Sequence, residues 1–207
     1  MTRELHRVGL LVLAAFALWY FVFQTGLWNF WARLSLAATL LATSALIVTP
    51  DRKQLFQARS RDGVLGIVSA LALYGIFWVG QQLALAILPF ASEQIGKVYA
   101  NRTQLDPLWI GLLLFFLVGP SEEIFWRGFV QRRLSEPLGS LGALFTTTAI
   151  YALVHIWTLN LMLILAAFVA GFVWGWLYQR ERSLISVMLS HALWDVVIFV
   201  IFPLAGR

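Results

Sequence analysis

The sequence predicts an all-α membrane protein, a polytopic bundle of about seven transmembrane helices, with six to eight as the range. Of its 207 residues, 60% are hydrophobic and only 12% are charged, and the mean hydropathy is +0.80. Soluble domains carry about 25% charged residues. The apolar residues fall in runs of about 20, the length that crosses a bilayer as a helix. We therefore expect an integral membrane protein with one transmembrane domain over residues 1–207.

Seven apolar runs can be separated along the chain. The first continues past the length of a signal peptide's apolar part and lacks a small-residue cleavage site, which predicts a retained helix. Thr49-Pro50-Asp51 ends the second run, and residues 89–107 form the longest polar connection. Gly119-Pro120 is expected to kink the fourth span; a half-helix within residues 89–107 or a split at Pro120 would change the count. The expected spans are residues 8–23, 30–48, 63–88, 108–134, 141–157, 161–178 and 184–203, with Trp19, Tyr20, Trp28 and Trp31 as an interfacial aromatic belt.

Basic residues between the spans indicate the orientation in the membrane. Cytoplasmic connections are enriched in Lys and Arg. With the N-terminus in the cytoplasm, ten basic residues lie inside and three outside, so this orientation is predicted. The net charge of +5 then reflects topology, and no nucleic-acid binding is expected. The inner set is Arg3, Arg7, Arg52, Lys53, Arg59, Arg61, Arg132, Arg133, Arg180 and Arg182, and the outer set is Lys97, Arg102 and Arg207.

Polar groups at three places inside the apolar runs point to a functional site. A charged side chain at the bilayer centre costs roughly 2.5–3.5 kcal/mol, so such groups need partners or a function. From the rise per residue, Glu122 lies about 15 Å, His155 about 20 Å and His191 roughly 10–12 Å from the cytoplasmic end of its span. Because these depths are similar, the three places can meet in one cavity.

Helical spacing predicts which polar side chains contact one another within each of the three segments. Glu123 and Arg127 are four residues apart with the acid first, which favours an ion pair. Glu122 projects about 100° away from Glu123 and is left free for the cavity. The other two places also pair residues one turn apart, Tyr151 with His155 and His191 with Asp195.

These residues predict a hydrolytic site. A buried carboxylate can take a proton from water and return it to a leaving amine, so Glu122 is the expected base, with His155 helping to hold the water. His191 is the candidate donor to the oxyanion, and Asp195 is expected to orient His191, with donation from a protonated Asp195 as the alternative. The same four groups could instead ligate a divalent metal such as zinc. There is no cysteine, so thiolate chemistry is excluded.

Other interpretations predict different behaviour. The pair of Glu123 with Arg127 can be a structural clamp. A transporter or proton-coupled permease also carries intramembrane charges, but it would have broken helices in two related halves, which the sequence lacks. A non-catalytic scaffold or immunity factor would tolerate Glu122→Gln. Ser121 is a weak candidate nucleophile, since no Gly-x-Ser-x-Gly or His-Glu-x-x-His motif is present.

At these residues the chain resembles the CPBP (Abi) family of intramembrane proteases, which includes the type II CAAX prenyl endopeptidases and bacteriocin-processing or self-immunity proteins. The family motifs are Glu-Glu-x-x-x-Arg, Phe-x-x-x-His and His-x-x-x-Asn/Asp on successive transmembrane helices. The resemblance covers residues 107–200, the family-like catalytic core. The motifs read here as Glu122-Glu123 to Arg127, Tyr151 to His155, and His191 to Asp195.

The resemblance implies an all-helical membrane endopeptidase in which Glu122 activates water with histidine assistance and the third motif lies near the oxyanion. The family has been described as metal-dependent and as glutamic; the glutamic mechanism without a cofactor is favoured, with zinc as the alternative. Tyr151 replaces the usual Phe and adds a hydroxyl that can bond His155 or Glu122, and Asp195 stands where prenyl proteases typically carry Asn. The expected substrate is a membrane protein or lipidated peptide, such as a C-terminal sorting tail or a peptide precursor. The expected location is the bacterial cytoplasmic (inner) membrane, and the oligomeric state is open.

Overall fold

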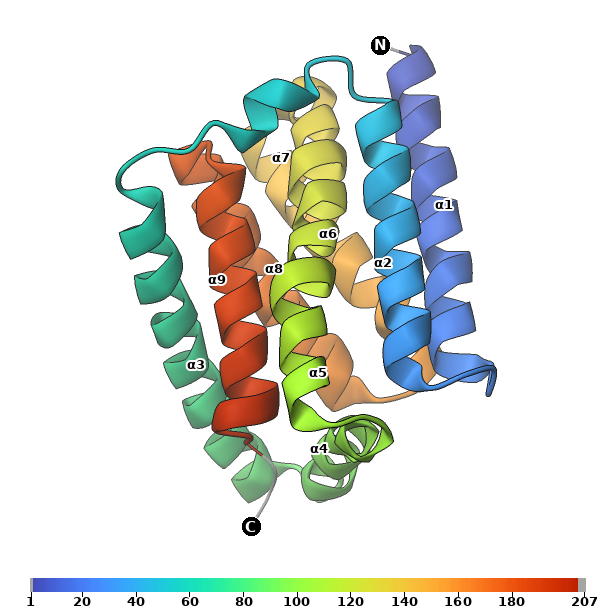
Figure 1. Cartoon of the computed structure of the whole chain (residues 1–207), viewed down its shortest axis with the longest axis vertical. Coiled ribbons are helices and arrows are strands. Elements are labelled where there is room, and N and C mark those ends of the chain that lie inside the picture. Colours follow the sequence, from blue (N-terminus) through green and yellow to red (C-terminus); the bar gives the residue numbers. More distant parts are fainter. Residues whose placement is uncertain (1, 205–207) are drawn as a thin grey trace.

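The computed structural model describes residues 2–204, and within this range the chain forms helices and no strands (Figure 1). Long helices pack side by side as a bundle, which confirms the predicted fold class. The α-helices are α1 Thr2–Gln24, α2 Phe30–Ile47, α3 Asp62–Ile87, α4 Ala91–Ala100, α5 Pro107–Leu113, α6 Gly119–Glu123, α7 Arg132–Leu153, α8 Leu161–Glu181 and α9 Leu184–Val196. The 3₁₀ segments are η1 Arg52–Phe56, η2 Asn101–Gln104 and η5 Val154–Thr158, and the π-helical segments are η3 Leu114–Val118, η4 Ile124–Gln131 and η6 Val197–Ile201.

The described residues contain six stretches that are long and apolar enough to cross a membrane. One of these, Pro107–Thr158, has 52 residues, which as a helix would be about 78 Å long, more than twice the roughly 30 Å of a bilayer core. Gly139, with φ 67° and ψ 173°, interrupts this stretch, and the ribbon reverses direction there (Figure 1). Such a positive φ suits glycine. Because it is interrupted at Gly139, this stretch can cross the membrane twice. With the other five stretches, this gives seven crossings, the predicted number.

The expected kink at Gly119-Pro120 is not found. Gly119 has helical angles, φ −54° and ψ −53°, and its N–H bonds to the Leu114 carbonyl five residues earlier. The wider π-helical turn of η3 accommodates the proline, and the backbone angles at Val118 and Gly119 stay helical. Gly119 instead allows a close approach to α9, because a Cβ atom there would lie 3.1 Å from the Ala192 backbone nitrogen.

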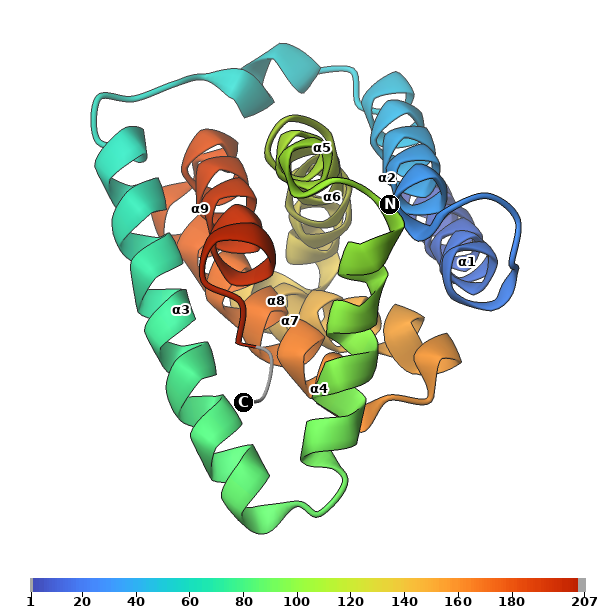
Figure 2. The ribbon, with the colours of Figure 1, turned by 60° about the horizontal axis from the view of Figure 1, so that its bottom comes forward.

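The connection predicted over residues 89–107 is also more ordered than expected, since it contains α4 and η2. Figure 2 shows α4 lying across the end of the bundle opposite to the N-terminus. Gln94 fixes it to the start of α8, because its carbonyl accepts from Asn160 Nδ2 at 2.7 Å and its side chain accepts from the Met162 N–H at 3.0 Å. This helix therefore covers one end of the bundle.

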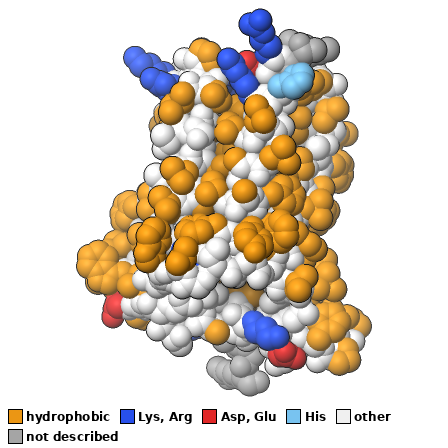
Figure 3. Space-filling view, turned by 90° about the vertical axis from the view of Figure 1, so that its right-hand side faces the viewer, with side chains coloured by type: hydrophobic (Ala, Val, Ile, Leu, Met, Phe, Trp, Pro, Cys, Tyr) orange, Lys and Arg blue, Asp and Glu red, His pale blue; other side chains and the backbone are white. Residues whose placement is uncertain are grey.

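Charged side chains gather at the end that holds the N-terminus, and an apolar band covers the middle of the molecule (Figure 3). Two ion pairs tie connections together at this end, Arg132 with Asp51 and Arg61 with Glu181. The hydrogen bond from Arg132 holds the pKa of the Asp51 carboxyl below its usual value. The distribution agrees with the predicted orientation.

Gly175→Ala is expected to destabilise the fold by about 1–3 kcal/mol, because an added methyl group overpacks the contact of α7 with α8. Its Cβ atom would lie 2.7 Å from Leu144 Cδ1 and 2.9 Å from Gln131 Oε1. Thermal unfolding in detergent measures the effect. Gly75→Ala in α3 is the control, since its Cβ would meet nothing within 4 Å. Equal melting temperatures for the two variants would contradict the close packing.

Candidate active site

Glu122 borders a cavity of about 650 Å³ inside the bundle. Its side chain is held by Tyr151 from α7, whose hydroxyl donates to Glu122 Oε2 at 2.9 Å. Tyr151, His155, His191 and Asp195 line the same cavity. The structure thus brings all four predicted catalytic residues to one cavity, and the tyrosine hydroxyl bonds to the carboxylate rather than to His155.

Glu123 is the centre of a buried network behind the cavity wall. Its Oε1 accepts from Arg127 Nη1 at 2.8 Å, which confirms the predicted ion pair, and both side chains are 0% exposed. The same oxygen lies 2.7 Å from His191 Nδ1, which donates to it. Helical spacing could not predict this second contact, because the two residues are 68 positions apart.

Arg127 links three helices at the level of the site. A second N–H of its guanidinium donates to the Gly171 carbonyl of α8 at 2.9 Å, and the guanidinium lies 5.0 Å from the centre of the Tyr151 ring. Gly171 makes this packing feasible, since a Cβ atom there would lie 2.8 Å from Tyr151 Cδ1. Arg127 therefore neutralises Glu123 and supports the tyrosine that holds Glu122.

His191 is fixed on two edges and one face. Its Nδ1 faces Glu123, and its Nε2 lies 3.4 Å from Asp195 Oδ2, one turn later in α9. The ring stacks on the indole of Trp174, with 3.7 Å between ring centres and 18° between planes. Trp174 was missed by sequence reasoning, since nothing in its local pattern distinguishes it from a lipid-facing aromatic residue.

His155 is also held at both ring nitrogens. Its Nδ1 lies 2.9 Å from the Tyr151 carbonyl, and its Nε2 accepts from the indole of Trp19 at 3.3 Å. A neutral ring with its proton on Nδ1 satisfies both contacts.

The predicted interfacial aromatic belt is wrong for Trp19 and Trp31, which are buried, whereas Trp28 is exposed.

The predicted catalytic residues were also the candidate ligands for a metal. Within residues 2–204, no group of three or more His, Asp and Glu side chains is positioned to hold an ion. Both nitrogens of His155 have partners in Trp19 and the Tyr151 carbonyl, and His191 Nδ1 bonds to Glu123, whereas His191 Nε2 lies 3.4 Å from Asp195 Oδ2. As placed, Glu122, His155, His191 and Asp195 do not form a zinc ligand set.

Comparison with known families identifies one match. Residues 104–197 match the family described as type II CAAX prenyl endopeptidase Rce1-like. The matched segment contains all of α5 to α9, and with them the residues of all three motifs. No curated protein and no solved structure matches the chain. The match over residues 104–197 of this integral membrane protein supports the CPBP family of CAAX-type intramembrane proteases.

Proposed function

We propose that the protein is a glutamic endopeptidase that hydrolyses a peptide bond of a membrane-anchored protein or peptide within the bilayer. The observation that carries this proposal is Glu122, a carboxylate only 7% exposed, on the wall of an intramembrane cavity that His191 and Asp195 also line. A buried carboxylate at that depth is costly unless it has a function.

Glu122 acts as the base and then as the acid. The Tyr151 hydroxyl occupies Oε2, which leaves Oε1 to accept a proton from a water molecule. The hydroxide attacks the scissile carbonyl carbon, and the carbonyl oxygen becomes an oxyanion. Protonated Glu122 then gives its proton to the leaving nitrogen as the C–N bond breaks. The reaction consumes one water and regenerates the carboxylate.

His191 stabilises the oxyanion in this mechanism. With Nδ1 donating to Glu123, a proton on Nε2 can be donated to a developing negative charge in the cavity. Asp195 orients the ring from the Nε2 side. His155 lines the cavity with its Nδ1 bonded to the Tyr151 carbonyl and its Nε2 to Trp19, so it would hold the water only if Nε2 exchanged Trp19 for it. Glu123 and Arg127 are positioning residues, since they lie behind the wall.

The substrate is expected to present an apolar stretch around the scissile bond, because most of the cavity lining is aromatic or aliphatic. C-terminal tails or peptide precursors of membrane-anchored proteins in a bacterial cytoplasmic membrane have this property. Such a chain inside the bilayer exposes peptide bonds to a site that excludes bulk water.

The test is a search for the substrate. Wild type and Glu122→Gln, purified in detergent, are incubated with membrane proteins from cells that lack the gene, and the peptides are compared by mass spectrometry. A cut made only by wild type supports the endopeptidase and identifies its substrate. Absence of any such cut, with wild type shown to be folded, favours a scaffold or a transporter.

Metal chelation is expected to leave cleavage within about twofold of the untreated rate, because the side chains around Glu122 do not form a ligand set. Cleavage of the identified peptide is measured after dialysis against EDTA and 1,10-phenanthroline. A thermolysin sample treated in parallel shows that the chelators work. Loss of activity that zinc restores would overturn the glutamic mechanism.

Tyr151→Phe is expected to lower kcat about tenfold with KM within twofold, because it removes the hydrogen bond to Glu122 and keeps the ring that packs on Arg127. Tyr20→Phe on the exposed side of α1 is the matched control and should not change either constant. An unchanged kcat would mean that the hydroxyl does not position the base.

A further inference from the structure

The catalytic cavity extends toward one end of the bundle only. Each long helix borders it with the part of its length that lies opposite to the N-terminal end, and α4 borders it at that end (Figure 1). Glu122 lies among its deepest residues. The lining includes Phe23 and Gln24 at the end of α1, Phe30 at the start of α2, Gln81 and Ala84 near the end of α3, and Tyr99 in α4.

On the other side of Glu122 the bundle is closed. Phe125, Trp126 and Phe129 of η4, which continues from Glu122 toward the N-terminal end, are at most 1% exposed. Hydrogen bonds of 2.9 Å from Arg127 Nη2 and Gln131 Nε2 to the carbonyls of Gly171 and Gly175 fasten η4 to α8 over two turns. The buried side chains of η4 and its hydrogen bonds to α8 separate the cavity from the N-terminal end, and we call this part of the structure the floor of the cavity.

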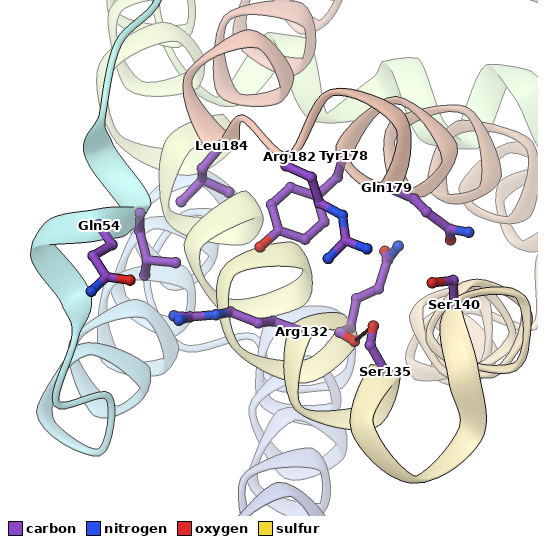
Figure 4. A pocket seen from close by; sticks show the side chains of 10 residues that line it. Gln54, Arg132, Ser135, Ser140, Tyr178, Gln179, Arg182 and Leu184 are labelled. Atoms are coloured by element: carbon purple, nitrogen blue, oxygen red, sulfur yellow. Dashed lines mark hydrogen bonds between the residues drawn. The ribbon is translucent and has the colours of Figure 1, made fainter.

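A second, polar pocket of about 330 Å³ lies beyond this floor, at the N-terminal end (Figure 4). Arg132, Ser135 and Ser140 border it from one side, and Tyr178 and Arg182 from α8 and its end. It shares no lining residue with the catalytic cavity. Water that enters from the basic end can therefore reach this pocket without reaching Glu122.

The charges identify the two ends. Of the basic residues that the structure describes, ten lie at the N-terminal end of the bundle and Lys97 and Arg102 lie at the other end, which places the N-terminal end in the cytoplasm. Resting on the proposed function, we infer that the protease receives its substrate from the outer face of the membrane, and that the substrate is a membrane-anchored segment of an exported protein.

The lining fits such a segment. Apart from the catalytic residues, the walls around Glu122 are apolar, with Phe77, Trp194 and Ala170 among them. Nearer the outer end the lining includes polar residues, among them Gln24, Gln81, Lys97, Asn101 and Asn160. A chain with apolar residues in the bilayer and a polar continuation outside matches this gradient. A lipidated tail presented in the cytoplasm would have to pass the floor formed by η4.

Cysteine accessibility tests the inference without requiring activity, because the chain contains no cysteine. Ala167→Cys places a thiol on the cavity wall, Thr103→Cys marks the outer end, and Ser140→Cys marks the polar pocket. Ala15→Cys, buried outside the cavity, is the negative control. Right-side-out and inside-out membrane vesicles that contain each variant are treated with a charged, membrane-impermeant thiol reagent, with and without the Glu122→Gln change.

We expect Thr103→Cys and Ala167→Cys to react at least tenfold faster in right-side-out vesicles, and Ser140→Cys to react faster in inside-out vesicles. Ala84→Cys, on the α3 wall of the cavity, should follow Ala167→Cys. Faster reaction of Ala167→Cys in inside-out vesicles, reaction from neither side, or reaction of Thr103→Cys from the inside would overturn the inference. Each of these outcomes can occur with an active protease, so the result does not depend on the proposed function.

Discussion

Glu122→Gln is expected to lower kcat for peptide cleavage by about 10²–10⁴-fold, the contribution of a positioned general base. The amide has almost the same shape as the carboxylate, and its oxygen can still accept from the Tyr151 hydroxyl. It cannot take a proton from water at neutral pH. The loss should therefore appear in kcat, while substrate binding and the melting temperature in detergent stay close to those of wild type.

Glu136→Gln, at an exposed position of α7, is the matched control and should be fully active. Asp195→Asn gives a second contrast. Prenyl proteases of the family typically carry Asn at this motif position, so the variant should retain measurable cleavage. If Glu122→Gln kept more than a tenth of the wild-type kcat, the base would have to be another group on the cavity wall, and Asp195 would be the first to examine.

Local sequence patterns were sufficient to predict the transmembrane spans and the contacts between residues of the same helix. Apolar runs located the crossings, and four-residue spacing predicted the pair of Glu123 with Arg127, because both depend only on neighbours along the chain. Similar depth also predicted that Glu122, His155 and His191 would meet. These predictions needed no knowledge of how the helices pack.

Contacts between helices could not be predicted in this way. Whether Glu123 faces His191, and whether Trp174 or Trp19 covers a histidine, depends on the rotation of each helix about its own axis. The π-helical turns of η3 and η4 change that rotation, and no local pattern announces them. The direction in which the cavity opens depends on the same packing, so it became visible only in the structure.

Arg127→Met is expected to destabilise the protein by about 3–5 kcal/mol, the cost of leaving a buried partner charge without compensation. Glu123 would keep His191 as its only hydrogen-bond donor, in a place with no exposure to water. The Gly171 carbonyl of α8 would also lose the hydrogen bond that it accepts from Arg127 of η4. Thermal unfolding in detergent measures the effect, with Arg180→Met at an exposed position as the matched control.

The double variant Glu123→Gln with Arg127→Met separates charge from packing. If the loss in Arg127→Met comes from an uncompensated carboxylate, removing that charge should recover part of the stability, and the double variant should melt above Arg127→Met. Its activity should nevertheless stay low, because an amide at position 123 no longer holds His191 with a carboxylate and the Tyr151 ring loses its guanidinium neighbour. A double variant that melted no higher than Arg127→Met would mean that the arginine acts through its packing between η4 and α8. Recovery of stability without activity would separate the structural part of this network, which keeps a charge neutral, from the part that orients His191 at the cavity.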